Sequence, residues 1–296
     1  MTQMRDESWQ LAAGDEVVPG CTAIEKLGGG NAYEAFRAFD ERLFAPVVVK
    51  IVRPNLVEDS GTLRGLRREV EMVGRLNHPV VVRGFHARTE GARPYLALES
   101  LDGPRLSTLL RRHGKLPMEQ LLPLGLEMCS ALHYLRGCGV VHLDIKPANI
   151  IMGAPPRLID LSIARSATDA AELDHVVGTD AYLAPEQADP AHTGPPGFAA
   201  DIWGLGATMF EALTGCRPFA EGVQDEAAPP QQRWPQLVAQ PAELPRRVPD
   251  VVSKPILACL DPSADARPTP RELAGLLEPL VDALPRPKLA GFRPRI

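Results

Sequence analysis

Residues 140–149 constrain this chain more than any other stretch, because they place three kinds of polar side chain directly after an apolar strand. The segment reads Val-Val-His-Leu-Asp-Ile-Lys-Pro-Ala-Asn and carries the carboxylate of Asp144, the ammonium of Lys146 and the amide of Asn149. Such a carboxylate can accept the proton of an attacking hydroxyl, the ammonium can neutralise charge on a phosphoryl group, and the amide oxygen can bind a divalent cation. A second carboxylate, Asp160, follows at the end of the next apolar segment. The pattern predicts phosphoryl transfer.

The segment 140–149 resembles the catalytic loop of protein kinases, His-x-Asp-x-Lys-x-x-Asn, and residues 160–162, Asp-Leu-Ser, resemble the Asp-Phe-Gly element that follows it. The lysine two residues after the aspartate is the form found in serine/threonine kinases. An isolated match of this kind also fits an ordinary turn with solvated charges, so its companions decide between the two interpretations. The resemblance implies catalytic roles for Asp144 and Lys146 and a metal site, for Mg²⁺ or Mn²⁺, at Asn149 and Asp160.

Composition and charge narrow the class of protein. A chain of 296 residues with 45% hydrophobic content can form one or two domains with a substantial core. Its net charge of −5 gives no reason to expect a nucleic-acid partner. We find no stretch with the apolar length of a membrane span and no apolar signal-peptide core near Met1, so we expect a cytoplasmic protein.

The cysteines carry no recognisable spacing motif. They are 5 in number, widely scattered and without a Cys-x-x-Cys pair, so their spacing indicates neither a disulfide framework nor a zinc site. We interpret them as small buried apolar residues. They are Cys21, Cys129, Cys138, Cys216 and Cys259.

A glycine-rich turn joins two strand-like segments near the N-terminus and predicts a hairpin. Glycines allow backbone N–H groups to approach phosphate oxygens, although an isolated Gly-x-Gly is more often a flexible hairpin tip. The turn resembles the kinase glycine loop, Gly-x-Gly-x-x-Gly-x-Val. Gly28 and Gly30 match that pattern, whereas Tyr33 replaces the third glycine and Ala35 replaces the valine.

Lys50 lies inside the apolar segment 46–52 and needs a partner, because an unpaired buried ammonium is very costly. The segment resembles the kinase Val-Ala-Ile-Lys strand, whose lysine binds the α- and β-phosphates and pairs with a glutamate on the next helix. Apolar residues at helical spacing predict that helix over 61–76. Glu69 is the best match for the pairing residue, with Glu71 as the fallback.

The resemblance also implies an adenine pocket between two lobes. Kinases usually have valine on the second strand and alanine on the lysine strand, and here Ala35 and Val48 exchange these sizes, a swap that conserves volume. Residues 99–103, Glu-Ser-Leu-Asp-Gly, resemble the hinge that binds adenine, although a plain strand exit has the same pattern. The implied ATP-binding residues are Leu27, Gly28, Gly30, Ala35, Val48, Lys50, Glu69, Leu98, Glu99 and Leu101.

Residues 178–186, Gly-Thr-Asp-Ala-Tyr-Leu-Ala-Pro-Glu, resemble the substrate-docking loop of protein kinases. The resemblance implies that Thr179 hydrogen-bonds near the catalytic loop and that Glu186 pairs with the distant Arg267. Asp201, at the start of a predicted buried helix, would accept hydrogen bonds from the catalytic-loop backbone. These features favour a kinase of proteins over a kinase of small hydroxylated molecules.

Departures from the kinase pattern keep an alternative open, a pseudokinase or nucleotide-gated scaffold with little turnover. Tyr33 adds bulk to the glycine loop, and Leu143 replaces an arginine that pairs with an activation-loop phosphate in many kinases. Ser162 restricts the backbone where the family has glycine. The alternative is opposed by the complete set Lys50, Glu69, Asp144, Asn149 and Asp160.

The implied fold is α+β, a two-lobed protein-kinase fold with a small antiparallel β lobe, one helix in that lobe, and a larger mainly helical lobe. The segment 163–178 is polar and is predicted to be mobile. The predicted divisions are a loosely held lead-in at 1–19, a kinase domain at 20–284 with its N-lobe at 20–99 and C-lobe at 103–284, and a short basic Pro-rich tail at 285–296.

The predicted function is transfer of the γ-phosphate of ATP to Ser/Thr hydroxyls of proteins, with autophosphorylation as a further outcome. The cofactors that the resemblance implies are ATP and Mg²⁺ (or Mn²⁺). The implied partners are protein substrates, and pairing of two copies into a homodimer through the β lobe stays open. Neither the physiological substrate nor an upstream signal follows from the sequence.

Overall fold

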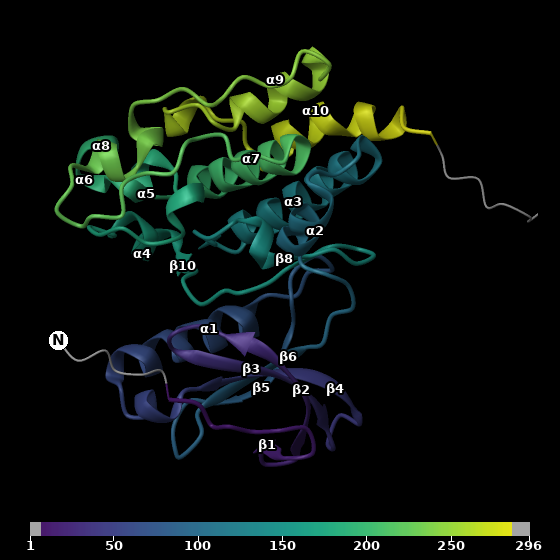
Figure 1. Ribbon diagram of the computed structural model, residues 1–296, viewed down its shortest axis with the longest axis vertical. Helices are drawn as coiled ribbons and strands as arrows, with labels where there is room; N and C mark the ends of the chain where they lie inside the picture. Colours follow the sequence, from purple (N-terminus) through teal and green to yellow (C-terminus); the bar gives the residue numbers. More distant parts are fainter. Residues whose placement is uncertain (1–6, 286–296) are drawn as a thin grey trace, which may run out of the picture.

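The computed structural model describes residues 7–285 and has two lobes stacked on each other (Figure 1). The N-lobe, drawn in purple and blue, is a sheet with one long helix, and the C-lobe, in teal to yellow, is mainly helical. The predicted two-lobed α+β fold is therefore confirmed. Of the predicted tail at 285–296, everything from residue 286 on lies outside the described residues, as do residues 1–6. Within 7–285, no helix combines the length and apolar character needed to cross a membrane.

The N-lobe sheet has 6 strands in the order β1-β2-β3-β4-β6-β5, with antiparallel neighbours throughout. Strand β4 shows how the alternation of side chains builds the site. Val47, Val49 and Ile51 are completely buried behind the sheet, whereas Val48 and Lys50 line the cleft between the lobes. The N-lobe elements are β1 (Glu16–Val18), β2 (Cys21–Gly29), β3 (Tyr33–Asp40), β4 (Ala45–Val52), η1 (Pro54–Leu56), α1 (Ser60–Arg75), β5 (Gly84–Arg88) and β6 (Tyr95–Glu99).

Helix α1 matches the prediction over 61–76 to within one residue at each end. It begins after Asp59, whose carboxylate accepts a hydrogen bond from the backbone N–H of Thr62 at 2.7 Å and so satisfies a free donor of the first turn. Leu66 and Glu69 are both buried, so the face that packs on the sheet also carries the glutamate inward.

The described part of the lead-in is firmly held. The indole Nε1 of Trp9 donates to the carbonyl of Val52 at 2.8 Å, and the Trp9 backbone N–H donates to the carboxylate of Glu34 at 2.9 Å. Val17 and Val18 of β1 are completely buried. The prediction of a loosely held lead-in is wrong here, because a few apolar residues in a polar segment pack against the sheet.

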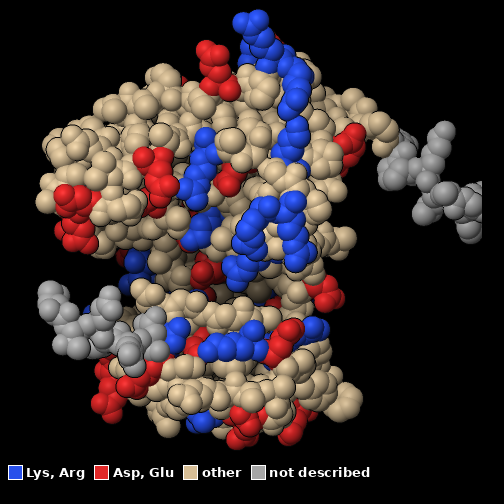
Figure 2. Space-filling model, viewed as in Figure 1, with Lys and Arg blue, Asp and Glu red and all other residues tan. Residues whose placement is uncertain are grey.

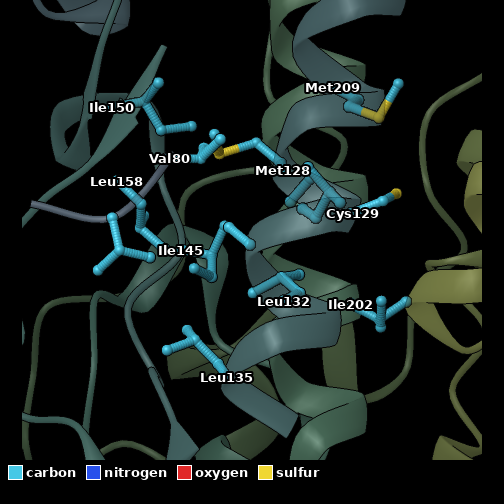
Figure 3. Packing of buried hydrophobic residues seen from close by; sticks show 14 of the residues in the cluster. Val80, Met128, Cys129, Leu132, Leu135, Ile145, Ile150, Leu158, Ile202 and Met209 are labelled. Carbon is cyan, nitrogen blue, oxygen red and sulfur yellow. The ribbon is translucent and has the colours of Figure 1, made fainter. Parts of the chain in front are cut away.

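The C-lobe is built around α3 (Met118–Gly137) and α7 (Phe198–Thr214). Leu132 of α3 lies between Ile145 of the catalytic loop and Ile202 of α7 (Figure 3). Almost every residue of α7 is buried, as expected of a helix that is apolar all round. The other C-lobe elements are α2 (Leu106–His113), β7 (Val140–Val141), η2 (Pro147–Asn149), β8 (Ile150–Ile151), β9 (Arg157–Leu158), β10 (Arg165–Ser166), α4 (Ala167–Ala171), η3 (Asp180–Tyr182), α5 (Pro185–Ala188), α6 (Pro190–Thr193), α8 (Pro230–Arg233), η4 (Pro235–Leu237), α9 (Asp250–Ala258), η5 (Ala264–Ala266) and α10 (Pro270–Asp282).

Two segments differ from their sequence-based expectations. The largely apolar sequence of residues 80–87 predicts a strand, but the strand forms only from Gly84 on, and Val81 instead bridges to Leu158 of the C-lobe. The segment 163–178, predicted to be mobile, contains β10 and the short helix α4, whose Ala170 is completely buried. In both cases the partner lies far away in the sequence.

Candidate active site

A cleft of about 770 Å³ lies between the lobes. The space-filling view shows it as a hollow with charged side chains of both signs around it (Figure 2). The glycine turn between β2 and β3, strands β4 and β6, and the catalytic loop surround this space. Every predicted ATP-binding residue lines the cleft, namely Leu27, Gly28, Gly30, Ala35, Val48, Lys50, Glu69, Leu98, Glu99 and Leu101, together with Lys146, Asn149 and Asp160.

Sequence reasoning missed several residues of the cleft wall. Val82, Ile151 and Ile159 add apolar surface to it. Alternation along β8 could have pointed to one of them, because Ile150 is completely buried in the core and its neighbour Ile151 must then face the other way. The remaining unpredicted lining residues are Gly29, Asn31, Ala32, Gly103, Arg105 and Ala148.

The ammonium of Lys50 lies between two carboxylates. Its Nζ is 2.7 Å and 3.0 Å from the two carboxylate oxygens of Glu69 and 3.2 Å from Oδ1 of Asp160. Burial would lower the pKa of Lys50, but these two charges outweigh it and raise the pKa, so the ammonium stays charged. The fallback partner Glu71 instead lies on the surface, 3.7 Å from Arg75.

Asp160 lies two residues after the end of β9 and adopts a left-handed backbone conformation, φ +68°, which aspartate tolerates better than most residues. Burial would raise the pKa of its carboxyl, but the Lys50 charge and the hydrogen bond from the Ser162 N–H lower it well below the usual range. Among the described residues, both contacts engage Oδ1, which leaves Oδ2 for a cation.

Four side chains form one hydrogen-bonded group at the catalytic loop. Nζ of Lys146 lies 2.7 Å from Oδ2 of Asp144 and donates to Oγ1 of Thr179 at 2.6 Å. The Thr179 hydroxyl in turn donates to Oδ1 of Asp144 at 2.7 Å. The amide nitrogen of Asn149 donates to Oδ2 and to the backbone carbonyl of Asp144 at 2.8 Å and 2.9 Å. The structure therefore brings the predicted docking-loop threonine directly to the predicted catalytic pair.

This arrangement suits a divalent cation with oxygen ligands. The amide nitrogen of Asn149 is engaged by Asp144, so its amide oxygen is the atom that can ligate a metal. Asp160 supplies an ionised carboxylate on the same side of the cleft. Carboxylate and amide oxygens are the donors that Mg²⁺ prefers, so the two residues fit the predicted ion.

The backbone of the catalytic loop is held by a residue of α7. The Asp201 carboxylate accepts hydrogen bonds from the N–H groups of His142 and Leu143, both at 2.8 Å. On the other side, the Gln187 side chain donates to the Leu143 carbonyl at 2.9 Å. Leu143 has φ +66°, an uncommon conformation for a branched residue, which persists only where the surroundings over-determine it.

The docking loop is held by a buried ion pair. Arg267 binds both carboxylate oxygens of Glu186, at 2.6 Å and 2.8 Å, and both side chains are almost completely buried. Such bidentate pairs are strong and fix geometry. Two side chains also bind Asp180 of this loop. The indole of Trp234 donates to the Asp180 carboxylate at 3.1 Å, and the amide of Gln236 donates to the Asp180 backbone carbonyl at 3.0 Å.

Comparison with known proteins gives one consistent result. The protein kinase domain family matches residues 21–275. The serine/threonine-protein kinase PknB of Mycobacterium leprae is 32% identical over 225 residues, 70% of this chain and 36% of that protein. The probable serine/threonine-protein kinase PkwA of Thermomonospora curvata is 31% identical over 258 residues, 86% of this chain and 33% of that protein. PknB of Mycobacterium tuberculosis is 32% identical over 234 residues, 73% of this chain and 37% of that protein. The chain thus spans about a third of the length of these relatives.

Proposed function

Because the chain belongs to the protein kinase family, we propose that it transfers the γ-phosphate of ATP to Ser or Thr hydroxyls of proteins. The observation that carries this proposal is the closed set of contacts among Asp144, Lys146, Asn149 and Thr179. Lys146 and Asn149 of this set line the same cleft as the ammonium of Lys50, which Glu69 and Asp160 hold. The names of the relatives, serine/threonine-protein kinases, support the same reaction.

On the N-lobe side, the chain's task is to hold the triphosphate. The glycine turn at 28–30 offers backbone N–H groups to phosphate oxygens, and Lys50 offers a permanent positive charge to the α- and β-phosphates. Apolar walls that include Ala35, Val48 and Leu98 enclose the space for the adenine ring. Glu69 keeps Lys50 from swinging away, because it holds the ammonium through both carboxylate oxygens.

On the C-lobe side, the chain aligns the acceptor and moves its proton. Asn149 and Asp160 would hold a Mg²⁺, which when bound would supply positive charge against the phosphate groups. Asp144 orients the acceptor hydroxyl and accepts its proton, and Lys146 stabilises negative charge on the transferring group. Thr179 donates to Asp144, so the acceptor hydroxyl would share that carboxylate with it.

The three departures from the kinase pattern leave every catalytic group in place. The hydroxyl of Tyr33 donates to the Thr62 carbonyl of α1 at 3.3 Å, and its ring lies over Nζ of Lys50, 4.6 Å from it. Leu143 is buried, and the N–H of Ser162 supports Asp160. Nothing in this arrangement favours the pseudokinase alternative.

A protein acceptor is favoured over a small molecule because the segment 178–186 resembles the kinase docking loop and is anchored through the contacts of Glu186 with Arg267. Autophosphorylation, a cytoplasmic location and pairing into a homodimer remain predictions from the sequence. The domain boundaries at 20 and 284 also remain predictions.

The proposal is tested by intact-mass detection of phosphate after incubation with Mg-ATP and a generic basic acceptor protein. An Asp144→Asn protein is the control, since it removes the proton acceptor and keeps the shape of the site. We expect phosphate on Ser or Thr of the acceptor with the wild-type chain and none above background with the control. ATP binding without transfer by either protein would refute the kinase activity and support a scaffold.

A further inference from the structure

Away from the cleft, three metal-ligating side chains converge in the N-lobe. Cys21 and Asp40 are directly opposed in the β2–β3 ladder, and His86 approaches them from β5 at the far edge of the sheet. The Cys21 Sγ, a carboxylate oxygen of Asp40 and a ring nitrogen of His86 all lie within 4.8 Å of one another. Cys21 and Asp40 are buried, while the His86 side chain is 18% exposed. The cluster therefore has a closed protein side and an open solvent side.

The Asp40 carboxylate divides its two oxygens between two tasks. Oδ1 accepts hydrogen bonds from the backbone N–H groups of Arg42 and Leu43, both at 2.8 Å, and so closes the turn after β3. Oδ2 faces the cluster, 3.5 Å from Sγ of Cys21 and 2.5 Å from Nε2 of His86. The oxygen that faces the cluster is thus not needed to hold the backbone.

The His86 ring is oriented in the same manner. Its Nδ1 lies 3.1 Å from the hydroxyl of Tyr95, and the two rings meet edge to face. Its Nε2 points at Asp40 and Cys21. A histidine that binds a metal through one nitrogen usually has the other held by a neighbouring group, and Tyr95 occupies that position.

We propose that Cys21, Asp40 and His86 form a zinc site, with a water from the open side beside His86 as the fourth ligand. Thiolate, imidazole and carboxylate are the donors that Zn²⁺ accepts together in tetrahedral sites with three protein ligands, whereas Mg²⁺ and Ca²⁺ prefer oxygen alone. The zinc site is separate from the cleft and from the Mg²⁺ site proposed there, because Cys21, Asp40 and His86 do not line the cleft.

Two of the three ligand-to-ligand distances can be compared directly with those of a zinc site. Ligand atoms about 2.0–2.3 Å from a tetrahedral ion lie roughly 3.3–3.6 Å apart. The 3.5 Å between Sγ of Cys21 and Oδ2 of Asp40 already fits. The hydrogen bond of 2.5 Å between Asp40 and His86 must open by roughly 0.8 Å, which a rotation of the partly exposed imidazole supplies.

Zinc binding replaces protons in this cluster. Burial raises the pKa of Cys21 to about 12, so the metal-free side chain is a thiol. On binding, the S–Zn bond forms and the thiol proton goes to solvent. Nε2 of His86 and Oδ2 of Asp40 exchange their hydrogen bond for two bonds to the ion. The ring proton moves through solvent from Nε2 to Nδ1, and the Nδ1–H then donates to the Tyr95 hydroxyl. No electron is transferred and no other reactant is needed.

The expected effect of zinc is a cross-link across the sheet. Strands β4 and β6 separate the β2–β3 ladder from β5, so the ion would join strands that have no ladder hydrogen bonds between them. It would close one end of the small core formed by Val17, Val18, Phe36 and their neighbours. Zinc should therefore raise the thermal stability of the N-lobe without contacting the nucleotide site.

The test is a zinc titration of the full chain after removal of metals with a chelator. Elemental mass spectrometry after dialysis gives the stoichiometry, and competition with a chromophoric chelator gives the affinity. We expect one zinc per wild-type chain. The affinity should fall at least about 100-fold in Cys21→Ser and His86→Gln and about 10-fold in Tyr95→Phe, which removes only the group that orients the imidazole.

Matched controls come from the C-lobe. Cys216→Ser and His113→Gln remove an exposed thiol and an exposed imidazole and should bind zinc as the wild type does. Because a variant in the cluster can fail to fold, Co²⁺ is added to the wild type as well, where a sulfur-to-cobalt charge-transfer band that zinc abolishes reports thiolate coordination. Absence of both retained zinc and this band in the wild type, or equal zinc binding by the cluster variants and the controls, would overturn the proposal.

Discussion

The two sides of the cleft hold their polar groups by different means. On the N-lobe side, the ammonium of Lys50 is held by contacts with other side chains, namely Glu69, Asp160 and the ring of Tyr33, so its place depends on groups carried by separate elements. On the C-lobe side, the loop around Asp144 is held through its backbone. Asp201 accepts hydrogen bonds from two of its N–H groups, and Gln187 donates to one of its carbonyls. The position of the Lys50 ammonium can therefore change when α1 or Asp160 moves. The backbone of the loop around Asp144 is instead fixed by hydrogen bonds to Asp201 and Gln187.

This difference predicts which property of the protein a substitution on each side of the cleft alters. A substitution on the N-lobe side should alter ATP binding and leave the C-lobe intact. A substitution in the C-lobe scaffold should instead lower the stability of the fold. A substitution of the proton acceptor alone should alter turnover only.

The largest effect is expected for Asp144→Asn. Loss of general base catalysis should lower kcat by about 10²–10⁴-fold, while ATP affinity and the free energy of unfolding change little. Steady-state transfer to a protein acceptor and calorimetric ATP binding measure the two quantities. A parallel loss of ATP affinity would show that Asp144 holds the nucleotide instead.

Arg267→Met should lower the free energy of unfolding by about 3–5 kcal/mol, because it leaves the buried carboxylate of Glu186 without its partner. Urea unfolding measures the loss. Arg75→Met is the matched control, since it breaks an exposed pair with Glu71 that contributes at most about 1 kcal/mol. Similar losses in the two variants would contradict a special role for the buried pair.

Lys50→Met should weaken ATP binding roughly 10–100-fold, the value of about 1.5–3 kcal/mol that a hydrogen bond to a charged group contributes. Isothermal titration gives the affinity. Lys26→Met removes a lysine of the same lobe that pairs with Glu34 and does not line the cleft, so its ATP affinity should equal that of the wild type. Unchanged ATP affinity in Lys50→Met would contradict the assignment of phosphate binding to the N-lobe side of the cleft.

The smallest effect is expected for Tyr33→Phe. It removes the 3.3 Å hydrogen bond to the Thr62 carbonyl and keeps the ring over Lys50, so ATP affinity should change about twofold, or roughly 0.4 kcal/mol. Titration with Mg-ATP measures it. A loss as large as that of Lys50→Met would mean that the hydroxyl, and not Glu69, holds the lysine side of the cleft.

Much of the site could be predicted because short sequence motifs contain most of its polar residues. A lysine inside the apolar β4 requires a partner, and the resemblance to the kinase lysine strand pointed to Glu69, which lies beside Lys50 in the structure. Ordered motifs likewise pointed to Asp160, which lines the cleft, and to Asp144, which contacts Lys146 of the cleft wall.

The rest could not be predicted because it depends on contacts between distant segments. The polar lead-in gave no sign that Trp9 would donate to Val52, 43 positions away. Cys21 and His86 lie 19 and 46 positions from Asp40, so no spacing motif marks the cluster that they form with it. Only the curled sheet brings such residues together.

The most direct test is whether Asn149 and Asp160 hold one cation in the cleft. A double-mutant cycle with Asn149→Ala and Asp160→Asn measures this from four ATP affinities in Mg²⁺, repeated with a chelator in place of Mg²⁺. A shared ion predicts a coupling energy of about 0.5–3 kcal/mol in Mg²⁺ that vanishes when the metal is removed. Additive losses, or a coupling that persists without Mg²⁺, would contradict a metal site at these two residues.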